Sequence, residues 1–264
     1  MIKTDYIKEL ARKGERADGR KFDEYRTPIT VEFGVSSKSA EGSARVLIGD
    51  TEVIAGVKME LGKPYPDKPD EGSIMVNVEL LPLASPKFEN GPPSIDAIEL
   101  ARVVDRAIRE SGSINFKKLC IEEGEKSWTV IIDIYPINAA GNLFDACSLA
   151  ALAAVKDARL PKLEGDVVDY KNRTDEKLPV EKDALECTVY KVGNVLMIDP
   201  TEDEEQAASA RLTVGVTEKG RICAMQKGGY EKLTQEEIIQ MVDLAIAKTA
   251  ELRKALENGK LYEI

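Results

Sequence analysis

Three arginines in one segment of the sequence have the spacing to bind phosphate groups together. Arg102, Arg106 and Arg109 fall within one arc of a helical wheel at about 100° per residue, roughly opposite the apolar residues of that segment. Arginine offers a planar fork of donors to phosphate oxygens and also stacks on bases, so the arc could clamp the backbone of single-stranded RNA. The same surface also contains Glu99, Asp105 and Glu110. Spacing alone therefore favours the alternative, in which the arginines are solvated or paired with these acids.

A run of acidic residues occupies positions 199–205, at the end of an apolar strand-like segment. Clustered carboxylates at the end of a strand can hold Mg²⁺ or act as general acid and base, and Asp199, Glu204 and Glu205 are the candidates. Pro200 ends the strand, however, and no calcium-loop spacing follows. The sequence therefore favours a solvated acidic loop over a metal site.

The segment from Thr129 to Val155 has the layout of a phosphate site but not its chemistry. An apolar strand leads through a small-residue turn into an alanine-rich helix. A helix start binds an anion when its free N–H groups face an open, glycine-rich turn. Here Leu143 and Phe144 crowd the turn, and Asp145 puts a carboxylate close to the position of the anion. A buried strand packed on a buried helix is the favoured interpretation, and a phosphate pocket is the alternative.

Composition excludes several kinds of chemistry. The 264-residue chain contains no histidine, which rules out Ser-His-Asp and Cys-His catalysis and imidazole ligation of metals. The four cysteines are widely separated, which favours buried thiols over a redox motif or a zinc site. A formal net charge of -10 opposes general coating of nucleic acid, so any RNA contact must be local. We expect no cofactor and no resident metal.

The sequence also bears on location. No stretch approaches the ~18 consecutive apolar residues of a membrane span. Residues 1–20 contain charges throughout rather than an apolar signal core. We therefore expect a cytoplasmic protein.

The elements that must position these residues form two α+β modules. We expect an amino-terminal helix and arm at 1–27, a first domain at 28–160, a surface linker at 161–182 and a second domain at 183–264. Alternating apolar residues predict mixed, mostly antiparallel sheets in both domains. The arginine helix should begin at Ser94 or Asp96 and run to about Ser111, and a capping box at 234–237 should start a long final helix.

Several segments, taken together and in order, resemble the RNase PH family. They are residues 16–20, 42–57, 91–93, 98–106, 141–146 and 199–205. More narrowly, the chain is similar to the non-catalytic RNase PH-type subunits of archaeal exosomes. The resemblance implies the RNase PH-like fold, which agrees with two α+β modules. Active members of the family degrade RNA from the 3′ end by phosphorolysis and release nucleoside diphosphates.

Departures from the family pattern imply that this chain lacks that activity. Active members have a glycine-rich turn with Ser, Thr or Arg side chains that bind phosphate. The corresponding residues here are Asn142, Leu143, Phe144 and Asp145. Active members also have two aspartates six residues apart, and these positions match Glu205 and Arg211. A cation at position 211 cannot replace a carboxylate that binds metal or moves a proton.

By resemblance, such a chain pairs with the catalytic RNase PH-type subunit, and three heterodimers form a ring that works with RNA-binding cap subunits on single-stranded RNA. Arg102 and Arg106 match arginines that grip RNA beside the partner's active site, whereas Arg109 matches less well. We therefore expect a non-catalytic ring subunit that binds RNA. Two alternatives remain: an autonomous phosphate-dependent exoribonuclease that uses Asp199, Glu204, Glu205 and Mg²⁺, and a purely architectural spacer.

Overall fold

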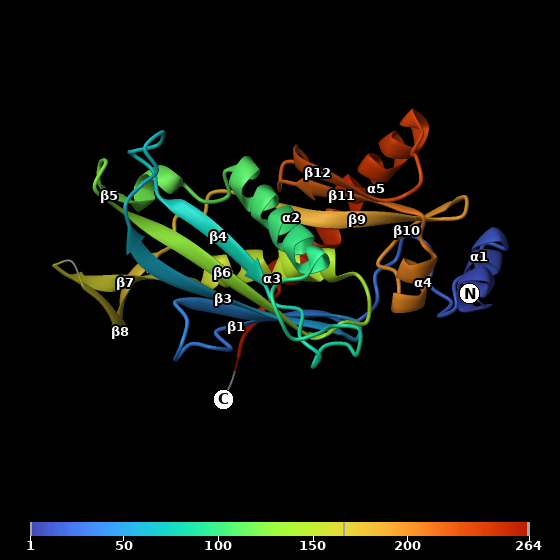
Figure 1. Cartoon of the computed structure of the whole chain (residues 1–264), viewed down its shortest axis with the longest axis horizontal. Helices are drawn as coiled ribbons and strands as arrows, with labels where there is room; N and C mark the ends of the chain where they lie inside the picture. The colour runs from blue at the N-terminus through green and yellow to red at the C-terminus, as the bar shows by residue number, and fades with distance from the viewer. Residues whose placement is uncertain (1, 166, 263–264) are drawn as a thin grey trace.

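The computed structural model describes residues 2–165 and 167–262, and its main features are two sheets with helices packed between and around them (Figure 1). Figure 1 shows the sheet of the first half of the chain on one side and the sheet formed by β9 to β12 on the other. The α1 helix lies at one end of the molecule, and the β7–β8 hairpin lies at the opposite end.

The first sheet alternates buried and more exposed residues, as expected for strands with one face on the core. Its strands are β1 (Ile29–Phe33), β2 (Gly42–Ile48), β3 (Thr51–Gly62), β4 (Ser73–Val78), β5 (Cys120–Glu122), β6 (Lys126–Asn138) and β13 (Lys260–Leu261). Their order is β13-β1-β2-β3-β6-β4, with β5 beside β6. Only the β1–β13 and β4–β6 pairs are parallel among the described residues, so the prediction of a mixed, mostly antiparallel sheet is confirmed.

The second sheet is antiparallel throughout its described strands. It contains β9 (Leu185–Val192), β10 (Val195–Ile198), β11 (Ala210–Val216) and β12 (Ile222–Gly229), in the order β10-β9-β11-β12. Every residue of β9 is buried, because α3 and α5 both pack against this strand.

Helices α2 and α5 begin where their caps predict. The α-helices are α1 (Ile2–Arg12), α2 (Ile95–Ser111), α3 (Leu143–Asp157), α4 (Glu202–Ala207) and α5 (Gln235–Glu257), and the short 3₁₀ helix η1 spans Phe116–Leu119. The Ser94 hydroxyl accepts the N–H of Ala97, and Gly112 ends α2 in the left-handed conformation. Thr234 and Glu237 form the predicted capping box of α5. None of the helices within the described ranges is long and apolar enough to cross a membrane.

Helix α3 is the central layer of the molecule. All its residues from Asp145 to Val155 are buried, and it packs against the first sheet and against β9. Its small side chains allow close approach: a Cβ on Gly42 would lie only 2.4 Å from the carbonyl oxygen of Ala154. The interpretation of residues 129–155 as a buried strand packed on a buried helix is therefore confirmed.

Two local expectations are corrected by the structure. The predicted linker at 161–182 largely forms a hairpin of β7 (Arg159–Glu164) and β8 (Val167–Lys177). The many charged residues of this segment concealed its strand pattern in the sequence. The centre of the Tyr170 ring on β8 lies 4.3 Å from the Lys58 ammonium on β3, which is a cation–π contact. The predicted acidic loop contains α4, and β13 returns from the second half of the chain to the first sheet. The domain boundaries themselves remain a prediction.

Candidate functional site

The turn between β6 and α3 is tightly constrained by its neighbours. Gly141 has φ of +105°, and a Cβ there would lie 2.3 Å from the carbonyl oxygen of Pro200. Asn142 follows in the left-handed conformation, with φ of 54°. Only glycine fits position 141, so the turn is held in one shape against the acidic segment.

The chain's own carboxylate occupies the anion position of this turn. The backbone N–H of Asn142 donates to Oε1 of Glu205 over 2.9 Å, and the Tyr190 hydroxyl donates to the same oxygen over 2.9 Å. Burial raises the pKa of Glu205, and these two hydrogen bonds act against that rise. A phosphate at this position would meet a negative side chain in place of a free backbone donor.

Asp145 adds a second buried carboxyl to the turn. It accepts the backbone N–H of Thr188 over 2.8 Å, the Tyr25 hydroxyl over 3.1 Å and the Asn142 amide over 3.1 Å. Burial raises the pKa of Asp145 to about 7 in spite of these donors. The donors around this turn therefore serve a side chain of the protein itself.

Asp199 and Glu204 are neutralised by arginines of the amino-terminal arm. Arg16 forms a two-pronged pair with Glu204, with nitrogen–oxygen distances of 2.9 and 2.6 Å, and both side chains are almost fully buried, at 0% and 2% exposed. Arg26 approaches Asp199 to 2.8 Å and Arg20 approaches it to 3.2 Å. The backbone N–H of Thr201 also donates to Oε2 of Glu204, over 2.9 Å, as part of the α4 capping box.

The acidic segment is thus neither a solvated loop nor a suitable magnesium site. The prediction of a solvated loop is wrong, because Asp199 and Glu204 are buried and Glu205 is largely enclosed by its partners. Their oxygens already accept guanidinium, hydroxyl or backbone donors, so they do not form an open oxygen set of the kind Mg²⁺ needs. No cluster of three or more potential metal-ligating side chains occurs in the described part of the chain.

The pairing of the arm with the acidic segment was not predicted from the sequence, in which residues 16–20 figured only as part of the arm and of the family resemblance. The available signal was charge: Arg16, Arg20 and Arg26 lie in one short segment, and the apolar strand preceding Asp199 indicates burial of that carboxylate.

The three arginines of α2 differ in what they bind. Arg102 and Arg106 are exposed and lie four positions apart, on one face of the helix. Arg109 is paired within α2, donating to both oxygens of Asp105 over 2.7 and 3.0 Å and to the Ile74 carbonyl over 3.1 Å. This pairing raises the pKa of Arg109. Of the three arginines that the spacing groups together, Arg102 and Arg106 have no ion pair among the described residues, whereas Arg109 has one.

Arg211 connects the two regions that the family pattern marked as lost. Its guanidinium lies 4.4 Å from the centre of the Phe144 ring and donates over 2.6 Å to Glu99 on α2. The structure therefore brings together the altered phosphate turn, the altered carboxylate position and the arginine helix. Sequence distance concealed this arrangement, since 112 residues separate Glu99 from Arg211.

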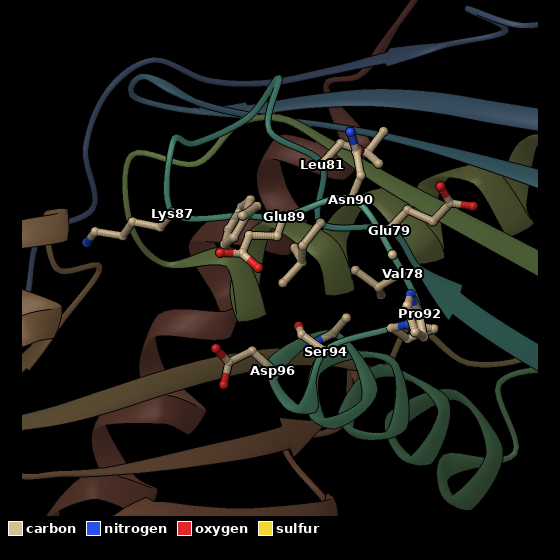
Figure 2. A pocket seen from close by; sticks show the side chains of 14 residues that line it. Val78, Glu79, Leu81, Lys87, Glu89, Asn90, Pro92, Ser94 and Asp96 are labelled. Atoms are coloured by element: carbon tan, nitrogen blue, oxygen red, sulfur yellow. The ribbon is translucent and has the colours of Figure 1, made fainter.

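A cavity of about 490 Å³ opens beside the first turn of α2 (Figure 2). Glu79, Glu89 and Asp96 line it, and Figure 2 shows Lys87 extending away from its centre. Lys87 pairs with Glu202 on α4, so it does not balance those acids. The negative lining makes this cavity unfavourable for phosphate, unlike the nearby surface of Arg102 and Arg106.

The fold defines an RNase PH-like protein, and the turn before α3 is filled by the chain's own side chains. The chain belongs to the 3′ exoribonuclease family: the model of family domain 1 matches residues 24–161, and the model of domain 2 matches residues 185–248. The resemblance seen in the sequence is thereby confirmed.

Individual relatives agree with this assignment. The chain is 51% identical over 257 residues to the exosome complex component Rrp42 of Methanocella arvoryzae, covering 97% of this chain and 96% of the relative. A solved structure of the Archaeoglobus fulgidus exosome with RNA bound to the active site contains a similar chain, with 44% identity, a TM-score of 0.89 and coverage of 96% of this chain and 97% of that one. A chain of an archaeal exosome core is 40% identical with a TM-score of 0.86, covering 97% and 96% respectively.

Proposed function

We propose that this protein is a non-catalytic subunit of an archaeal exosome ring, which holds RNA for phosphorolysis by a catalytic RNase PH-type partner. The observation that supports a non-catalytic role best is the bond from the Asn142 N–H to Glu205, because it consumes a donor that the attacking phosphate would need. Arg26 and Arg16 likewise engage the carboxylates that an autonomous enzyme would use.

Arg102 and Arg106 are the proposed RNA contacts. Both are exposed on α2, and neither forms an ion pair among the described residues, so their charges are available to backbone phosphates. Arg109 is proposed to support the helix, because Asp105 already holds its guanidinium. The chain has a net charge of -10, so this local pair would attract RNA only where the protein surface directs it.

The proposed partners follow from the relatives. The curated relative is an exosome component, and a similar chain occurs in a solved exosome with RNA at the active site. We propose that three heterodimers of this chain and the catalytic subunit form the ring, that RNA-binding cap subunits join it, and that its substrate is single-stranded RNA. We also propose a cytoplasmic location for this protein.

Reconstitution with the catalytic subunit tests this function. The mixture should form a particle with the mass of three heterodimers, and the ring should bind single-stranded RNA. Arg102→Glu with Arg106→Glu should leave the mass unchanged and weaken RNA binding at least tenfold at moderate salt. Unchanged affinity would refute the RNA contact.

A charge-matched control uses one exposed and one half-buried arginine on elements other than α2. Arg12 lies on α1 at one end of the molecule, and Arg159 is the first residue of the β7–β8 hairpin, which lies toward the other end (Figure 1). Reversing both charges changes the net charge as much as the α2 double variant does. RNA affinity of this control ring should stay within about twofold of the wild type, which separates a local contact from a general field effect.

A further inference from the structure

A chain of polar contacts runs from the second sheet to the exposed face of α2. Arg211 on β11 donates to Oε2 of Glu99 over 2.6 Å, and the Gln226 amide on β12 donates to Oε1 of the same carboxylate over 3.4 Å. The other end of the Gln226 amide accepts the guanidinium of Arg106 over 3.2 Å. Both oxygens of Glu99 and both ends of the Gln226 amide therefore have partners.

This arrangement orients Arg106 without neutralising it. An amide has one donor end and one acceptor end, so donation to Glu99 turns the Gln226 oxygen toward Arg106. A neutral acceptor fixes the guanidinium without forming an ion pair with it. Arg109, one turn along the helix, shows the contrasting outcome, because both oxygens of the Asp105 carboxylate accept from its guanidinium.

The same contacts keep Glu99 away from Arg102. These two residues are three apart on α2, a spacing at which acid and arginine pair readily. Arg211 and Gln226 instead occupy the carboxylate, and Arg102 has no ion pair among the described residues. Its guanidinium therefore remains available to a phosphate.

The Arg211 side chain is closely enclosed by its neighbours. Its side chain is 14% exposed and lies on the Phe144 ring, and a Cβ on Gly228 would fall 1.3 Å from its Nη1 atom. That Nη1 is buried and makes no hydrogen bond with any described residue. A buried donor without an acceptor lowers the stability of the folded state, so this atom of Arg211 destabilises the fold.

We infer that Arg211 is a positioning residue for RNA binding: through Glu99 and Gln226 it keeps Arg102 unpaired and Arg106 aimed outward. This inference rests on the proposed RNA contact of α2. It assigns a role to a residue that occupies the place of a carboxylate in active relatives.

The test compares reconstituted rings with wild-type chain, Arg211→Met, Glu99→Gln and the Arg211→Met/Glu99→Gln double variant. Single-strand RNA affinity is measured across a salt series. In Arg211→Met, Glu99 is free to pair with Arg102, so affinity should fall about three- to tenfold and the slope of log K against log salt should become shallower by about 0.7, as expected for one lost phosphate contact. The double variant removes the competing charge and should recover most of both losses, with Glu99→Gln alone as its reference.

The outcomes separate this inference from the function on which it rests. If Arg102→Glu/Arg106→Glu weakens RNA binding but Arg211→Met changes neither affinity nor slope, the positioning role is wrong and the proposed function stands. Loss in Arg211→Met without recovery in the double variant also overturns it, because it indicates only structural damage. If the α2 double variant binds RNA normally, the proposed function itself fails.

A second variant covers the case in which the Arg211→Met ring does not assemble. Gln226→Leu keeps Arg211 but removes the acceptor of Arg106 and one donor to Glu99. Its ring should show the same direction of change in affinity and salt slope. Wild-type values for Gln226→Leu would overturn the inference.

Discussion

Arg16 illustrates how single side chains close the acidic segment of this protein. Its guanidinium pairs with Glu204 in a site where both side chains are buried, and it also donates to the carbonyl oxygens of Ile198 and Asp199. Arg16→Met should lower the free energy of unfolding by roughly 3–5 kcal/mol, because it leaves a buried carboxylate unpaired. Urea unfolding measures the loss. Arg12→Met, which removes an exposed partner of Glu9, is the control, and equal losses in the two variants would refute the buried-pair account.

Asp145 makes stability depend on pH in a defined direction. Burial raises its folded-state pKa from 3.8 to about 7, so the folded protein binds a proton that the unfolded chain has released. The contribution of Asp145 to the free energy of unfolding should therefore fall as pH rises from about 4 to 7, by at most about 1.4 kcal/mol per pH unit, and level off above that.

Asp145→Asn isolates this effect from other buried acids such as Glu205, whose pKa is also raised by burial. The difference in unfolding free energy between wild type and variant should change across that pH window and be flat above it. A difference that is constant from pH 4 to 8 would show that Asp145 does not titrate there.

At the scale of elements, the turn before α3 depends on one glycine. Gly141→Ala would impose a left-handed φ on alanine and a contact of 2.3 Å with the Pro200 carbonyl oxygen. The expected loss of stability is more than about 2 kcal/mol, from strain and displacement of the acidic segment. Gly124→Ala is a matched control with φ of +75° and no atom within 4 Å of the added carbon. Thermal unfolding should separate the two variants, and similar midpoints would exclude the close approach as the cause.

The elements also show which features the sequence could reveal. The start of α2 after Ser94 and the capped start of α5 were predicted correctly, because helix capping is a local pattern. Helix α4 was missed, since its acidic residues resemble a solvated loop until Arg16 is placed beside them. That arginine is 188 residues from Glu204, and no local pattern reports such a pair. The same limit applied to Arg211 and Glu99, which meet only when the two sheets pack through α2 and α3.

At the scale of the whole molecule, the amino-terminal arm, the acidic segment and the β6–α3 turn are held together by buried contacts, while α2 presents Arg102 and Arg106 on the outside. The chain belongs to the 3′ exoribonuclease family and is similar to a chain of a solved exosome with RNA bound to the active site. We therefore propose that the partner subunit carries out the chemistry and that this chain positions RNA.

Phosphorolysis by the reconstituted ring is the most direct test of that assignment. The measurement is the rate of phosphate-dependent release of nucleoside diphosphates as a function of RNA concentration, for wild type and for Arg102→Glu/Arg106→Glu. We expect KM for RNA to rise at least tenfold and kcat to stay within about threefold, because the variant removes binding of RNA without touching the reacting groups. Unchanged KM in the variant ring, or release of nucleoside diphosphates by this chain without its partner, would contradict the account.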